Sequence, residues 1–85
     1  MKKIEKKKVI REKTLTALDK IFAKEYPSGR VTVWGNRFDA FVECKGFSGP
    51  SKRVEKILAG LNVKIIEQQW SEGSDYTGYY YWIAE

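Results

Sequence analysis

The chain has 85 residues, of which 42% are hydrophobic and 32% are charged, and its formal net charge is +5. These values predict one small globular domain with a modest core and exclude a disordered chain. No apolar run is long enough to span a bilayer, and no apolar segment follows the basic N-terminus, so we expect neither a membrane anchor nor a signal peptide. The single cysteine, Cys44, excludes an internal disulfide; we expect it to be buried in a cytoplasmic protein.

The positive charge is concentrated at the N-terminus. Up to Lys13 the chain holds seven basic and two acidic residues, whereas the nine basic and nine acidic residues that follow cancel. We therefore divide the domain into a basic arm or helix start (1–13) and a folded body (14–85). The candidate phosphate-binding residues of the arm are Lys2, Lys3, Lys6, Lys7, Lys8 and Arg11. Each would add a salt-dependent increment to nucleic-acid affinity, although a solvated helix start is the alternative interpretation.

The first half of the body predicts a helix and a hairpin. Apolar residues recur at helical spacing between about residues 9 and 25. Two β-rich segments then flank Gly35-Asn36, which we interpret as a two-residue turn with a positive φ at Gly35. This register pairs Trp34 with Arg37 and makes one face wholly apolar. We expect that face to be core, and it holds Val31, Val33, Phe38, Ala40 and Val42. The other face holds Arg30, Thr32, Trp34, Arg37, Asp39, Phe41 and Glu43.

The second half repeats the order of elements without repeating the residues. A short helix follows Pro50, and two further strands are predicted over 62–70 and 79–84. The order α-β-β-α-β-β indicates an α+β fold with a four-stranded, mostly antiparallel sheet and both helices on one face.

The last strand, within "YYYWIAE", divides its aromatic residues by alternation. The eight-residue loop before it does not determine the register. If the loop turns about Gly73-Ser74, Trp82 faces Ile65, and Trp82 is core together with Tyr80. The expected exposed binding face then comprises Arg30, Trp34, Arg37, Trp70, Tyr79 and Tyr81.

Three interpretations of this face remain. Aromatic and arginine side chains on a flat sheet stack bases and hold phosphates. The same residue types supply the energetic centres of protein interfaces. They also simply shield the back of a small sheet, with the arginines lying over the rings.

Catalysis is not expected. The chain has no histidine, so it lacks the usual general base and a histidine metal site, and Cys44 has no histidine partner. No spacing of carboxylates matches a metal loop. We therefore expect a non-enzymatic protein without metal or cofactor, and the sequence leaves its oligomeric state open.

The stretch "AKEYPSGRVTVWG…DAFVECKGFSGPSKRVEKIL" resembles a family of small α-β-β-α domains associated with large polyvalent proteins of phages and conjugative elements. The similarity covers about half of the chain and lies in a helix ending near a proline, a strand pair and a Gly-Pro helix start. The "YYYWIAE" strand departs from the pattern. The resemblance implies a mobile-element origin and anti-defence work, and it transfers no catalytic residue.

Two functions are therefore expected from different classes. In the first, the protein binds a host nucleic-acid-processing enzyme stoichiometrically and inhibits it, as anti-CRISPR or anti-restriction proteins do. In the second, it is a nucleic-acid-binding accessory protein that uses the basic arm and the sheet face.

Overall fold

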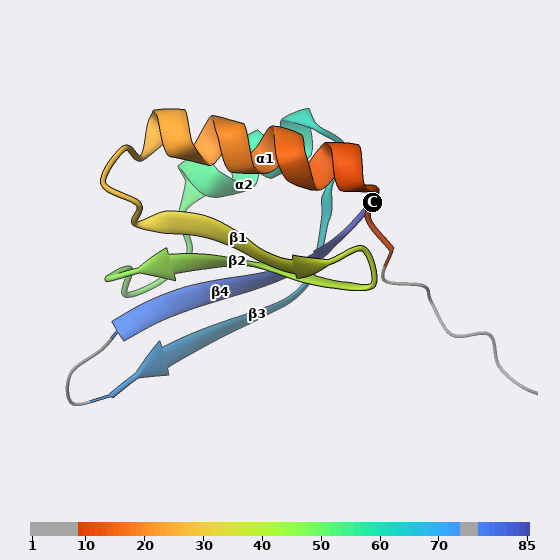
Figure 1. The fold of residues 1–85 in the computed structure, drawn as a ribbon. Helices are drawn as coiled ribbons and strands as arrows, with labels where there is room; N and C mark the ends of the chain where they lie inside the picture. The colour runs from red at the N-terminus through yellow and green to blue at the C-terminus, as the bar shows by residue number, and fades with distance from the viewer. Residues whose placement is uncertain (1–8, 74–76) are drawn as a thin grey trace, which may run out of the picture.

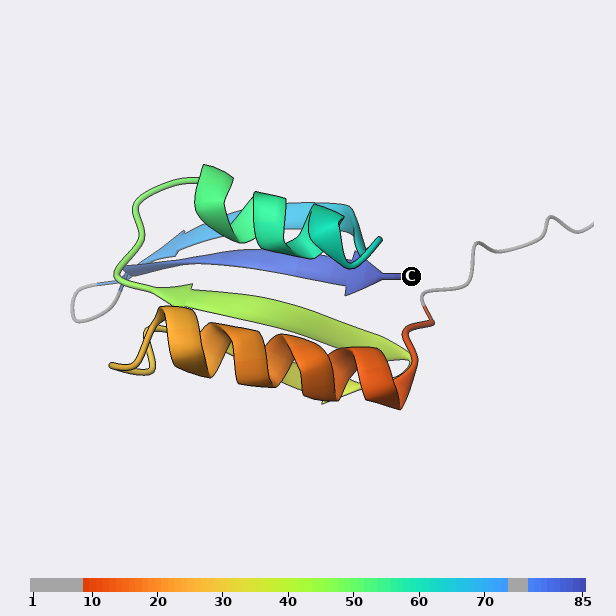
Figure 2. The same cartoon turned by 90° about the horizontal axis from the view of Figure 1, so that it is seen from above.

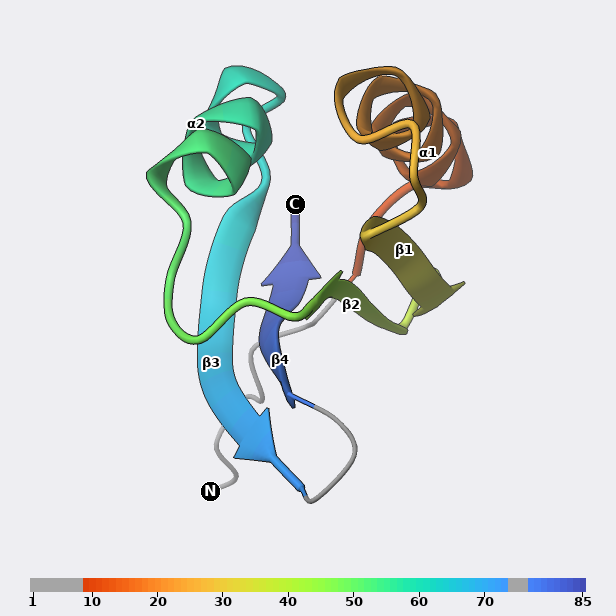
Figure 3. The same ribbon diagram turned by 90° about the vertical axis from the view of Figure 1, so that its left-hand side faces the viewer.

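The structure is a computed structural model, and it describes residues 9–73 and 77–85. It confirms the predicted α+β fold: two helices lie on one face of a four-stranded antiparallel sheet with strand order β1-β2-β4-β3 (Figure 1). The elements are α1 (Glu12–Glu25), β1 (Val31–Asn36), β2 (Asp39–Lys45), α2 (Lys52–Gly60), β3 (Lys64–Glu72) and β4 (Thr77–Ala84). Figures 2 and 3 show α1 along the β1–β2 side of the sheet and α2 along the β3–β4 side. Among the described residues, no helix lies on the opposite face of the sheet.

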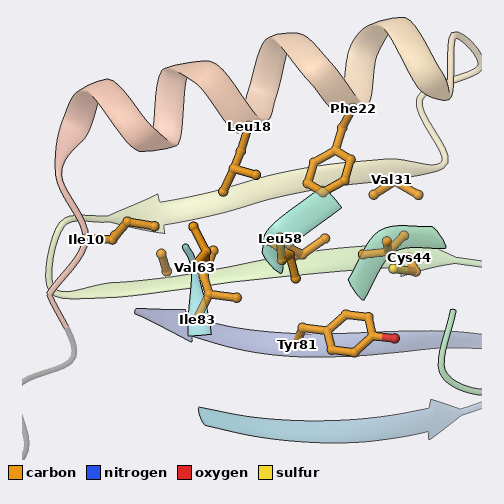
Figure 4. Close-up of a cluster of buried hydrophobic side chains, with 12 residues drawn as sticks. Ile10, Leu18, Phe22, Val31, Cys44, Leu58, Val63, Tyr81 and Ile83 are labelled. Carbon is orange, nitrogen blue, oxygen red and sulfur yellow. The ribbon is translucent and has the colours of Figure 1, made fainter. Parts of the chain in front are cut away.

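The core lies between the sheet and the two helices (Figure 4). Helix α1 contributes Leu18 and Phe22, and helix α2 contributes Val54 and Leu58, because these residues recur every three or four positions on one side of each helix. The buried cluster comprises Ile10, Leu18, Phe22, Val31, Ala40, Val42, Cys44, Val54, Leu58, Val63, Tyr81 and Ile83.

Helix α1 begins later than the predicted start near residue 9. Ile10 is extended, and its N–H donates to the carbonyl of Arg37 at 2.8 Å. The Glu85 carboxylate ties the C-terminus to the start of the helix, because it accepts from the N–H of Arg11 at 2.8 Å and from Oγ1 of Thr14 at 2.9 Å, and its negative charge lies at the N-terminal end of the helix. The Arg11 side chain also hydrogen-bonds this carboxylate and holds the pKa of Glu85 down at about 2. This stabilisation is present above the ordinary carboxyl pKa and is lost as the pH falls towards 2.

The first hairpin turns two residues later than predicted. Its loop is Arg37-Phe38, and Trp34 pairs with Phe41 rather than with Arg37. The later turn adds Gly35–Ala40 and Asn36–Asp39 to the ladder, and Oδ1 of Asn36 accepts from the N–H of Phe38 at 2.9 Å. Because the shift is an even number of residues, the two faces keep their predicted members. Arg37 and Phe38 are the exceptions, since both lie in the turn, and Phe38 is 63% exposed.

The β3–β4 pairing differs from the predicted register, and the difference exchanges the two faces of β4. Ile65 pairs with Ile83, and Glu67 pairs with Trp82, so β3 holds one extra residue at this point. Such a β-bulge shifts the alternation of one strand relative to the other. Trp82 therefore does not face Ile65, and the expectation that Tyr80 and Trp82 are core is wrong: Tyr81 and Ile83 are fully buried instead.

Gly35 confirms the predicted positive φ, at +99°, although it lies in β1 rather than in a turn. A Cβ built there would lie 2.0 Å from the carbonyl oxygen of Asp39. We expect Gly35→Val to lower the free energy of unfolding by about 3 kcal/mol or more, because backbone strain adds to a backbone clash. Chemical denaturation measures this.

The matched control is Gly29→Val. Gly29 also has a positive φ, +81°, but a Cβ there meets no atom within 4 Å. This variant should lose only the strain, roughly 1 kcal/mol. Equal losses at the two glycines would show that β1 and β2 do not approach at Gly35 as described.

Candidate functional site

The side of the sheet opposite the two helices has two adjacent rows of side chains at its centre. Residues paired across antiparallel strands project from the same face, so the register alone defines these rows. Trp34, Phe41, Trp82 and Glu67 form one row across the four strands, and Thr32, Glu43, Tyr80 and Gln69 form the next. We call these eight residues the open face. It lies opposite both helices (Figure 3).

Half of the open face is aromatic. The rings of Phe41 and Trp82 stack with centroids 5.5 Å apart at 30°, and each lies 6.0 Å from the ring of Tyr80. These three residues are half-buried, largely by one another, whereas Trp34 at the β1 edge is 47% exposed. The result is a cluster of three contacting rings with Trp34 paired beside Phe41, and aromatic patches of this kind often mark a contact site.

Glu43 lies between these aromatic residues and is held by them. The indole Nε1 of Trp34 donates to its Oε1 at 2.8 Å, and the hydroxyl of Tyr80 donates to its Oε2 at 3.4 Å. Each carboxylate oxygen therefore has a donor from a neighbouring strand. This arrangement orients a negative charge within an aromatic surface.

The open face carries negative charge only. Glu43 and Glu67 are its charged residues, and none of its eight members is basic. Lys45 and Lys64 project from the same side of the sheet just outside the open face, because they pair with Gly78 and Ala84, which belong to the same alternating set along β4. Helix α2, on the opposite side of the sheet, carries Lys52, Arg53 and Lys56 against one acid, Glu55.

The two predicted arginines do not lie against the open-face aromatics. The guanidinium of Arg30 lies over the ring of Phe47, 5.1 Å from its centroid, and that of Arg37 lies over Phe38 at 5.2 Å. Arg37 belongs to the hairpin turn rather than to a strand. Of the six residues predicted as the exposed binding face, only Trp34 belongs to the open face.

Trp70, Tyr79 and Tyr81 lie on the helix-covered side, so their predicted place beside Trp34 is wrong. The cause is the extra residue in β3, which reverses the assignment of β4. Tyr81 is fully buried, and its hydroxyl accepts from the N–H of Ser51 at 2.7 Å and donates to Glu55 at 2.8 Å. Burial raises the pKa of this hydroxyl. Trp70 pairs with Tyr79 on the edge strand and is 49% exposed.

The predicted binding residues omitted Phe41, Glu43, Tyr80 and Trp82 of the open face. Phe41 and Glu43 were assigned to the correct face but were not included among the predicted binding residues, although both alternate with buried positions of β2. Tyr80 and Trp82 carried the same alternation signal as Tyr79 and Tyr81, so only the register separates the two sets.

The structure describes only residues 9–13 of the basic arm. Lys2, Lys3, Lys6, Lys7 and Lys8 lie outside the described residues. Arg11 is described and pairs with Glu85. Together with Glu12, Lys13 and Arg37 it lines an open hollow of about 500 Å³.

Cys44 is buried in the core, and desolvation raises the pKa of its thiol to about 12. It is therefore protonated at neutral pH and is a poor nucleophile. Within residues 9–73 and 77–85, the side chains form no group of three or more metal ligands. None of the helices in this part of the chain has the length and apolarity to cross a membrane.

Comparison with known proteins found no matching family model, no matching curated protein and no matching solved structure.

Substitutions in the two alternating sets of β4 side chains should lower the stability of the protein by different amounts. We expect Tyr81→Ser to lower the free energy of unfolding by about 3–5 kcal/mol, because it leaves a cavity in the core and removes a hydroxyl bound to α2. Trp82→Ser on the open face should cost roughly 1–2 kcal/mol, because the indole is half-exposed. Urea denaturation of both variants measures the difference. A larger loss for Trp82→Ser would mean that the two faces are reversed.

Proposed function

We propose that this is a small non-catalytic protein that binds a partner protein stoichiometrically through the open face. The observation that carries the proposal is the pair of central rows on the side of the sheet opposite the helices, which hold four aromatic residues and two carboxylates, while Lys45 and Lys64 lie towards the ends of the strands on the same side. Aromatic residues at the centre of a desolvated patch supply most of the energy in protein interfaces.

The charge of the open face favours a protein partner over nucleic acid at this surface. Binding to a phosphate backbone depends on Lys and Arg, and on this side of the sheet the lysines, Lys45 and Lys64, lie outside the aromatic centre. Its carboxylates complement a basic surface instead. Proteins that process nucleic acids have such basic surfaces, because they must hold phosphates.

We therefore infer that the partner is a host nucleic-acid-processing defence enzyme and that binding inhibits it, in the manner of anti-CRISPR or anti-restriction proteins. The resemblance to small domains of phage and conjugative-element polyvalent proteins supports a mobile-element origin within this proposal. The fully buried and protonated state of Cys44 is consistent with action by binding rather than by chemistry.

The test is affinity capture from host-cell lysate after nuclease treatment. The wild-type protein should retain a partner protein and should abolish the activity of that partner on nucleic acid at about a 1:1 ratio. Trp34→Ser should weaken capture by about tenfold or more, because this ring has the exposure and position of an interface anchor. Quantitative mass spectrometry and a titration of the inhibited enzyme measure the two effects.

Trp70→Ser is the matched control. Trp70 is exposed to almost the same extent as Trp34, 49% against 47%, but it lies on the other side of the sheet. Capture should be unchanged in this variant. The proposal is wrong if Trp70→Ser abolishes capture and Trp34→Ser does not, or if every retained protein disappears after nuclease treatment.

A nucleic-acid-binding accessory role is the second candidate, and one observation favours it. Arg11, Lys13 and Arg37 converge on the hollow at the start of α1, where the lysine-rich segment joins the body. Cationic side chains at the start of a helix suit phosphate groups. Under this proposal the arm end, rather than the aromatic face, holds the nucleic acid.

Deletion of residues 1–8 tests this second role. We expect any affinity for DNA or RNA to fall and its salt dependence to flatten, because the deletion removes five lysines. Fluorescence anisotropy across a range of salt concentrations measures both quantities. Unchanged affinity with an unchanged salt slope would exclude a role for the arm.

A further inference from the structure

We propose that the protein forms a dimer in which strand β3 pairs in antiparallel orientation with β3 of a second copy of this chain, with Trp70 opposite Trp70. The inference does not rest on the proposed function. It concerns the edge of the sheet, and strands that pair edge to edge leave the open face of each chain uncovered by the other copy.

Strand β3 lies at an edge of the sheet, and in the described part of the chain it has β4 as its only neighbouring strand (Figure 1). It is nine residues long, and most of them are exposed. From Glu67 to Glu72 it pairs regularly with β4, and this segment contains neither proline nor lysine, the residues that usually protect an edge. The segment therefore presents main-chain donors and acceptors in the geometry that another strand binds.

The second edge of the sheet does not offer the same geometry. Strand β1 has six residues, and Gly35, with its φ of +99°, interrupts the extended backbone. A contact between β3 of one copy and β1 of the next would also repeat from molecule to molecule without closing. Pairing of β3 with itself about a two-fold axis closes at two copies, so the regular edge selects a dimer.

The side chains of the segment select the register of this pairing. Opposed residues of an antiparallel pair share a face, so the axis must relate residues of one alternating set. With the axis at Trp70, the indole meets its own copy, and Gln68 meets Glu72 of the second chain. Trp70 is 49% exposed, and an aromatic pair across two strands stabilises their contact. The amide of Gln68 is a donor and the carboxylate of Glu72 an acceptor, so this pair is also complementary.

Other registers suit the segment less well. An axis at Gln69 sets each Trp70 against an amide instead of a ring. An axis at Glu67 sets two carboxylates directly against each other, which is destabilising. An axis at Gln68 carries the pairing through the extra residue between Ile65 and Glu67, where the alternation of faces breaks.

The two-fold axis is perpendicular to the sheet, because opposed residues share a face. The two four-stranded sheets therefore join into one, with the helices of both copies on one side. Both open faces lie on the other side, one in each chain. The dimer thus presents two open faces in the same direction and leaves the ratio of partner to chain unchanged.

Sedimentation equilibrium of the full chain over a range of concentrations tests the dimer. The wild-type mass should rise from the 9.9 kDa of one chain to twice that value as the concentration increases. Trp70→Lys sets two like charges against each other and should raise the dissociation constant of the dimer by about tenfold or more. Trp70→Glu should do the same. An equimolar mixture of the two variants should associate again, because the proposed register sets their opposite charges against each other.

Phe38→Lys is the matched control. It also replaces an exposed aromatic residue with lysine, but Phe38 lies in the β1–β2 turn rather than on β3. Its association should equal that of the wild type. Circular dichroism verifies that each variant is folded. If neither charged variant folds, Trp70→Ser takes their place and should also weaken the dimer by about tenfold.

The inference is overturned if the wild-type chain stays monomeric at every concentration, and the edge would then be one for a strand from a different protein. It is also overturned if a folded Trp70→Lys variant associates as tightly as the wild type, if the mixed variants stay monomeric, or if Phe38→Lys disrupts association equally. These outcomes are separate from failure of the proposed function. A monomeric chain that still captures its partner through Trp34 would remove the dimer and leave the proposed function intact.

Discussion

The pairing of β3 with β4 decides which aromatic side chains the protein buries and which it exposes. The chain places Tyr79, Tyr80, Tyr81 and Trp82 in succession, and strand geometry directs neighbours to opposite faces. Either set could pack under the helices on hydrophobicity alone. The extra residue of β3 between Ile65 and Glu67 sets Ile83 opposite Ile65, and Tyr81 thereby enters the core. The composition of the open face follows from this one pairing.

The buried tyrosine is stabilised by more than hydrophobic contact. Its hydroxyl would be costly to bury without partners, and it has them at the start of α2, in the N–H of Ser51 and the carboxylate of Glu55. A tryptophan at the same place has a single N–H donor and no acceptor, so it could not accept from Ser51. The core therefore selects tyrosine at this position, and Trp82 remains on the opposite side with Phe41.

The elements and their order were predictable because apolar spacing and turn residues mark them clearly. The faces of the β1–β2 hairpin were also predictable, although its turn was misplaced, because a shift of two residues leaves alternation unchanged. The C-terminal strand was not predictable. A single extra residue reverses its two faces, and no residue type in "NVKIIEQQW" marks the position of a bulge. The candidate site was therefore the least well predicted part, since it is assembled across the strands in which the sequence constrains the register least.

The arginines were misplaced for a different reason. Alternation locates a Cα on one face of the sheet, but a long side chain at the end of a strand can reach rings elsewhere.

The account depends on the pairing around the extra residue of β3, and cross-strand NOEs measure it directly. In an antiparallel ladder, protons of directly opposed residues lie close enough to give strong signals. The structure predicts backbone NOEs between Ile65 and Ile83 and between Glu67 and Trp82, together with contacts from the Tyr81 ring to helix α2. NOEs between Ile65 and Trp82 and between Val63 and Ala84, in a ladder without an extra residue, would contradict the account. They would place Trp82 beneath the helices and Tyr81 on the open face.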